Sequence, residues 1–150
     1  MLIRRVKKKI NIFRSLVHLK HKIFRLKEPP VSISIGLAWG AAVSFTPLIG
    51  LHIAICLLGT YLMKGNMLAA LAGTVIGNPW TFPLIFFIDY KLGVFFGITG
   101  VASFEISLNF FYLNFEKIFF PTLIGSIPLF LFVWLITYNI SIFVIQRYKK

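Results

Sequence analysis

Three long stretches of this chain carry no Lys, Arg, Asp or Glu, and they limit what it can fold into. They cover residues 29–63, 65–88 and 118–146. Each is longer than the roughly 20 apolar residues that a helix needs to cross the hydrocarbon core of a bilayer. Only 13% of all residues are charged, whereas soluble domains contain about a quarter. The pattern therefore predicts an all-α integral membrane protein.

Positive charge is concentrated at the N-terminal end. The net charge is +12, and ten of the sixteen Lys and Arg residues lie within residues 1–27, which contain no acid. Three more cations, Arg147, Lys149 and Lys150, close the chain. By the positive-inside rule we expect both termini in the cytoplasm and an even number of membrane crossings.

Residues 1–28 are predicted to form a basic amphipathic segment, followed by a single membrane domain over residues 29–150. Apolar residues recur at spacings of three and four from Ile3 to Val17, which favours a helix in the membrane interface. A basic tail that only fixes orientation is the alternative. Nucleic acid is not expected as a partner, because no aromatic stacking platform accompanies the cations. The cations expected to contact anionic lipid headgroups are Arg4, Arg5, Lys7, Lys8, Lys9 and Arg14.

Prolines divide the first two uncharged stretches into half-length helices. Pro47 separates segments of about 21 and 24 Å of helix, each shorter than a hydrocarbon core of about 30 Å. We therefore expect residues 33–63 to form a re-entrant hairpin that turns at Pro47. Residues 67–98 are expected to cross as a broken helix, interrupted at Asn78 and Pro79.

The C-terminal third is predicted to contain two further helices. Residues 101–117 place Glu105, Asn109, Tyr112 and Glu116 on one helical face, which is typical of an interfacial helix. Residues 118–145 form the clearest transmembrane helix. The simplest path with an even number of crossings leaves Lys64 on the cytoplasmic side.

Two segments of the chain resemble a known family. They are "PPVSISIGLAWGAAVSFTPLIGLH" (residues 29–52) and "GNMLAALAGTVIGNPWTFPLIFFIDYKLG" (residues 65–93), and "PTLIGSIPL" (residues 121–129) is similar to the family's last helix. The family is the bacterial membrane family called "domain of unknown function" 2062. Its pattern is G-x-x-P-x-x-G-x-H, then an Asn, then a small-residue stretch into N-P-x-T, and then Tyr and Gly. Ser44 departs from it, since glycine is usual there. The residues that match the pattern are Pro47, Gly50, His52, Asn66, Gly73, Asn78, Pro79, Thr81, Tyr90 and Gly93.

The family has no established activity. The resemblance therefore implies a fold and a bacterial inner-membrane location more than a function. A weaker likeness links the chain to the DedA superfamily, whose members have re-entrant loops and are implicated in lipid scrambling and proton-coupled transport of lipid carriers. The acidic and arginine residues of the proton-coupled members have no clear counterparts here.

Backbone groups freed at a helix break cannot face lipid, so they must be buried in protein or line a wet cavity. Two interpretations follow: half-helix ends that present polar groups to a substrate or ion, or dry kinks that Asn78 and Thr81 cap. For Asp89, the alternatives are a functional intramembrane acid and a residue at the membrane interface. His52 is either a proton acceptor or a packing residue. The candidate residues of a substrate or ion pathway are Pro47, Gly50, His52, Asn78, Pro79, Thr81, Asp89 and Tyr90.

The sequence gives no support for an enzyme. It has no paired carboxylates, no nucleophile with a base at motif spacing, no metal-ligand cluster and no phosphate-binding loop, so we expect no catalytic residues, metal or cofactor. The leading hypothesis is a transporter-like or lipid-translocating protein with a site between the two broken arms. The alternative is a non-transporting module that packs against a partner or against itself as a homo-oligomer, because small residues at 36–42 and 69–73 favour helix association.

Overall fold

All regular structure in the described part of the chain is helical. The structure is a computed structural model that describes residues 28–48, 50–78, 80–101 and 107–148. The predicted all-α class is confirmed for these residues, while the predicted N-terminal helix, Pro79 and residues 102–106 lie outside them. The helices are α2 (Pro30–Val43), α3 (His52–Leu62), α4 (Met67–Gly73), the short 3-10 helix η1 (Thr74–Ile76), α5 (Phe82–Phe95), α6 (Leu108–Leu113) and α7 (Phe115–Tyr148).

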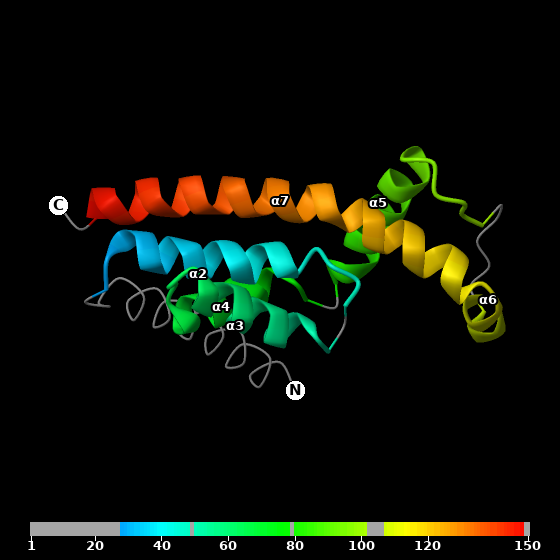
Figure 1. Cartoon of the computed structure of the whole chain (residues 1–150), viewed down its shortest axis with the longest axis horizontal. Helices are drawn as coiled ribbons and strands as arrows, with labels where there is room; N and C mark the ends of the chain where they lie inside the picture. The colour runs from blue at the N-terminus through cyan, green and yellow to red at the C-terminus, as the bar shows by residue number, and fades with distance from the viewer. Residues whose placement is uncertain (1–27, 49, 79, 102–106, 149–150) are drawn as a thin grey trace, which may run out of the picture.

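Helix α7 runs the length of the molecule, and the other long helices pack along it (Figure 1). Ile33, at the start of α2, shares a buried cluster with Ile145, near the end of α7. Farther along α2, the Trp39 ring meets the Phe130 ring edge-on, with 5.4 Å between centroids. The two helices are therefore antiparallel, and the start of α2 lies at the same end of the molecule as the end of α7 (Figure 1).

Helices α2 and α4 run parallel and touch through their backbones. The α4 backbone passes so close to Gly40 that a side chain there would not fit. An added Cβ would lie 2.8 Å from both the Gly73 Cα and the Thr74 nitrogen. Seen from the other helix, a Cβ on Gly73 would lie 2.6 Å from the Leu37 carbonyl oxygen. Such close approach requires small residues on both helices, which explains the small-residue pattern in the sequence.

Helix α3 returns antiparallel to α2 and brings the chain back to the start of α2. The Asn66 amide donates a hydrogen bond to the Ser32 carbonyl (2.8 Å), and Gly65 packs on Ile35. The Asn66 side chain then caps α4 by accepting from the Ala69 amide at 2.7 Å. Residues 33–63 thus form a helical hairpin, and Lys64 lies at the same end of the molecule as Glu28.

The predicted helix over residues 101–117 differs from the structure. Asn114 leaves helical geometry and separates α6 from α7, and its side chain donates to the Phe110 carbonyl at 3.1 Å. Helix α7 begins at Phe115, before the predicted start at 118. A side-chain amide that bonds to the preceding turn competes with helix continuation, which accounts for the break.

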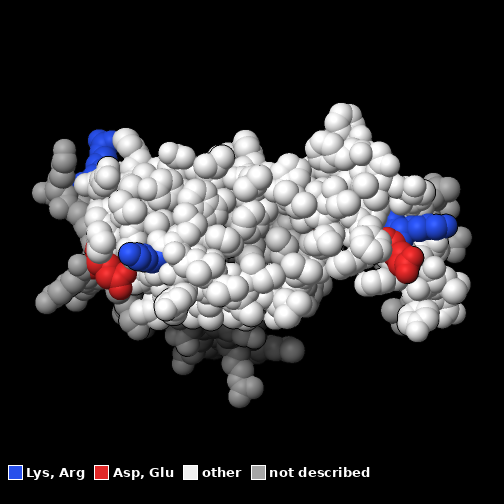
Figure 2. All heavy atoms as spheres, viewed as in Figure 1, with Lys and Arg blue, Asp and Glu red and all other residues white. Residues whose placement is uncertain are grey.

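The surface of the described residues is largely apolar. On the face seen in Figure 2, charged side chains lie only at the two ends of the long axis, and the band between them is uncharged. Helix α7 is the described helix that is long and apolar enough to cross a membrane, at 34 residues. Large apolar side chains exposed along it are Ile127, Leu131, Phe132, Leu135, Ile140 and Phe143.

Candidate functional site

The first helix break follows α2, and its polar side chains are satisfied locally. The Ser44 hydroxyl donates to the Gly40 carbonyl (3.1 Å) and the Thr46 hydroxyl to the Val43 carbonyl (2.8 Å). The Gly50 amide donates to Nδ1 of His52 at 3.2 Å, and Gly50 has a positive φ of 93° that favours glycine. His52 therefore shapes the turn into α3, with one ring nitrogen used as an acceptor.

The second break, between η1 and α5, is a reciprocal helix cap. The Asn78 side-chain oxygen accepts from the Trp80 amide (3.0 Å) and the Thr81 amide (3.2 Å). In return, the Thr81 hydroxyl oxygen accepts from the Asn78 amide at 3.1 Å. This is the geometry of a capping box, with Thr in the place of the usual Glu or Gln. Asn78 and Thr81 accordingly close the turn that leads into α5, whose first helical residue is Phe82.

The two breaks lie next to each other. Helices α2 and α4–η1 are parallel and begin at the same level, so they also end together. A Cβ added to Gly77 would lie 2.7 Å from both the Cβ and the Oγ of Ser44. We call this contact the break junction, defined by Ser44, Thr46, Gly77, Asn78 and Thr81. Helix α2, which precedes the first break, and helix α5, which follows the second, both pack on α7.

Asp89 lies in a separate place, on the face of α5 that meets α7. Its exposed fraction is 0%, and neither carboxylate oxygen has a hydrogen-bond partner in the described part of the chain. The helices cross at their backbones here: a Cβ on Gly125 would collide with the Asp89 carbonyl oxygen and lie 2.6 Å from the Gly93 amide nitrogen. We call this crossing, formed by Asp89, Gly93, Pro121 and Gly125, the α5–α7 seam.

Tyr90 and Lys91 point away from Asp89. The Tyr90 hydroxyl accepts from the Val101 amide at 2.7 Å and so anchors the chain that follows α5. The Lys91 ammonium lies over the Phe87 ring, 5.5 Å from its centroid. The lysine is exposed whereas Asp89 is buried, so these two charges do not compensate each other.

The predicted site residues thus do not converge on one site. Asn78 and Thr81 lie at the second break, next in sequence to the contact between Gly77 and Ser44, whereas Asp89 lies in the seam and Tyr90 anchors a loop. The residues of α7 that complete the seam, Pro121 and Gly125, were not among the predicted site residues. Their signal was present as small residues and a proline in "PTLIGS", but nothing in the sequence alone paired them with Asp89.

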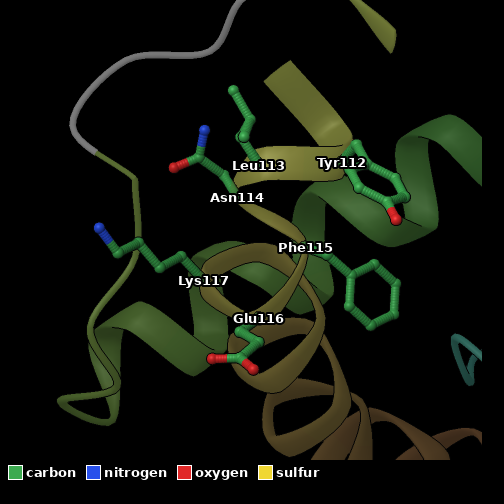
Figure 3. A pocket seen from close by; sticks show the side chains of 6 residues that line it. All are labelled: Tyr112, Leu113, Asn114, Phe115, Glu116 and Lys117. Atoms are coloured by element: carbon green, nitrogen blue, oxygen red, sulfur yellow. The ribbon is translucent and has the colours of Figure 1, made fainter. Parts of the chain in front are cut away.

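A hollow at the junction of α6 and α7 does not form a convergent site. It is about 680 Å³ in volume and is lined by Tyr112, Leu113, Asn114, Phe115, Glu116 and Lys117. Figure 3 shows that these side chains splay apart around the turn, with Tyr112 and Phe115 on one side and Lys117 and Glu116 on the other. Among the described residues, no three His, Cys, Asp or Glu side chains are placed to hold a metal ion.

Over the described residues, these features define a class: an all-helical protein with one helix long enough to cross a membrane, two adjoining helix breaks and a buried acid. The chain belongs to a bacterial family whose description is "uncharacterized protein conserved in bacteria (DUF2062)", and the family's model matches residues 13–150. The expected family is confirmed, whereas the likeness to the DedA superfamily is not shown. No curated protein and no solved structure matches the chain.

Proposed function

We propose that the protein is embedded in the bacterial inner membrane and moves a lipid or another solute past the break junction. In this arrangement α7 is one crossing, and α4, η1 and α5 together form the other. Helices α2 and α3 enter from the side of Lys64 and return to it. The basic residues before α2 contact anionic headgroups on the same, cytoplasmic side.

The observation that carries the proposal is the meeting of two helix breaks beside α7, within an uncharged band of surface. The apolar side chains exposed along α7 suit contact with lipid chains better than contact with water. Helix ends inside a membrane supply backbone N–H and C=O groups at a depth where lipid offers none. Broken helices that meet in this way are the usual setting of solute and ion sites in membrane transporters.

A disulfide across the break junction tests the proposal. Ser44→Cys and Gly77→Cys, combined in a Cys56→Ala background, would place the two cysteine Cβ atoms 2.7 Å apart before any shift of the backbone. Disulfide-bonded Cβ atoms lie about 3.5–4.5 Å apart, so a shift of about 1 Å allows the bond. In vesicles, we expect phospholipid scrambling or solute flux to stop on oxidation and to return on reduction.

Each single-cysteine variant is the control, and its activity should not respond to oxidation. A folded wild-type protein that moves neither lipid nor solute would refute the proposed function. Equal rates for the oxidised and reduced double variant would show that the pathway does not pass through the break junction.

A non-transporting packing module is the second candidate, and one observation favours it. The side chains at both breaks already have partners within the chain, as expected for dry kinks, and Ser44 is 3% exposed. Water-soluble thiol reagents separate the candidates, because a working pathway must let them reach a cysteine at position 44 or 77. The small residues that suggested a homo-oligomer pack within the chain, between α2 and α4.

A further inference from the structure

Asp89 is the described ionisable side chain that the fold buries completely and leaves without a partner. It is 0% exposed, and both of its carboxylate oxygens are unpaired. The capping residues at the two breaks, by contrast, are all hydrogen-bonded. Asp89 therefore requires an explanation that a cap or a turn does not provide.

Among the residues that the structure describes, no side chain donates a proton to Asp89. Helix α5 packs mainly against α7, where Thr122 and Ser126 are buried beside Gly125. Each hydroxyl has a single proton, and each is already used: Thr122 donates to the Ile118 carbonyl (2.6 Å) and Ser126 to the Leu123 carbonyl (2.7 Å).

No charged group of α7 faces Asp89 either. Helix α7 has no charged or titratable side chain between Lys117 and Tyr138. The neighbours on α5 itself are accounted for, since Tyr90 bonds to Val101 and Lys91 lies over Phe87. A carboxylate in this position would be an uncompensated buried charge, which costs several kcal/mol.

We propose that Asp89 is a proton-binding site that alternates between a neutral acid in the closed α5–α7 seam and a carboxylate when the seam opens to water. This inference rests on the membrane placement given under the proposed function, and it names the ion that the site takes. On protonation, an O–H bond forms at one carboxylate oxygen and the residue's charge goes from −1 to zero. On release, the same proton passes to water.

Helix α5 is bounded by a turn at each end. Asn78 and Thr81 close the turn before it, and after its last residue, Phe95, Gly97 has a φ of 87° that marks a second turn. At the crossing, glycines on both helices leave Asp89 beside bare backbone, so a small separation of the helices exposes the carboxyl group. Because water favours the ionised acid and the closed seam favours the neutral one, the protonation state and the separation of the helices are coupled.

Infrared spectroscopy tests the inference directly, because the chain has only four acidic side chains. Combining Glu28→Gln, Glu105→Gln and Glu116→Gln leaves Asp89 as the single acidic side chain. In vesicles of this triple variant, we expect a carboxylic-acid C=O band that grows as the pH is lowered and shifts in D₂O. Adding Asp89→Asn should abolish the band, and adding Asp89→Glu instead should keep it at a shifted position.

The inference would be overturned if the protein, with its helical circular dichroism intact, showed no pH-dependent acid band that Asp89→Asn removes. This measurement does not depend on transport. Wild-type protein that moves no lipid or solute but retains the Asp89 band would refute the proposed function alone. Active protein whose flux and infrared spectrum are both unchanged by Asp89→Asn would overturn the proton site alone.

Discussion

Replacing Gly125 with alanine should force α5 and α7 apart. The new Cβ would lie 2.6 Å from the Gly93 nitrogen and 2.8 Å from the Asp89 carbonyl carbon, whereas ordinary van der Waals contact begins near 3.4 Å. These atoms are backbone, so no side-chain rotation relieves the clash. The Asp89 carbonyl oxygen would lie closer still, so the helices must separate by more than about 1 Å. A gap of about 0.5–1 Å already forfeits about a quarter to a half of each contact energy.

The expected net loss of stability is about 1–2 kcal/mol. Overpacking a tight contact costs about 1–3 kcal/mol, and a clash with backbone belongs at the upper end of that range. Alanine has a higher helix propensity than glycine by about 1 kcal/mol, which offsets part of the cost. A loss of this size lowers the folding equilibrium constant about 5- to 30-fold.

Equilibrium unfolding in mixed micelles, with increasing sodium dodecyl sulfate and helical circular dichroism as the signal, measures the change. Ile127→Ala is the matched control, because it alters the same helix at a side chain that is 55% exposed. We expect the control to unfold almost like wild type. If Gly125→Ala were as stable as the control, the close crossing of α5 and α7 would be refuted.

Three further predictions follow from the fold. Gly40→Ala should destabilise the protein by about 1–3 kcal/mol in the same unfolding assay, because its Cβ would meet the α4 backbone; wild-type stability would contradict the parallel pairing of α2 and α4. Asn78→Ala should cost about 0.5–2 kcal/mol by removing the cap of α5, and Asn78→Asp should restore most of it; equal losses in both would argue against a cap. Single cysteines at Lys64 and Lys117, in the Cys56→Ala background, should react with impermeant thiol reagents from opposite sides of sealed vesicles; reaction from one side only would exclude α7 as a crossing.

The sequence alone determined the class of the protein and the positions where its helices end. Proline and the Asn78–Thr81 pair act on their own turn of backbone, so their effect is visible without knowledge of the fold. The half-length helices on either side of Pro47 and the distribution of charge also predicted that residues 33–63 turn back, so that Lys64 lies at the end where α2 begins. The structure does not continue the predicted helix over residues 101–117 through Asn114. The side chain of Asn114 bonds to a carbonyl one turn earlier and so competes with the helix.

Only the tertiary structure decided which small residues meet and where Asp89 lies. The sequence presents Gly40, Gly73, Gly93 and Gly125 as equivalent, yet the first two join α2 to α4 and the last two join α5 to α7. Whether an acid is buried depends on which helix crosses its face, and that is set by packing between residues more than 30 positions apart. For this reason the sequence alone did not decide whether Asp89 is a residue at the membrane interface or a functional acid. In the structure, the crossing of α5 and α7 buries it.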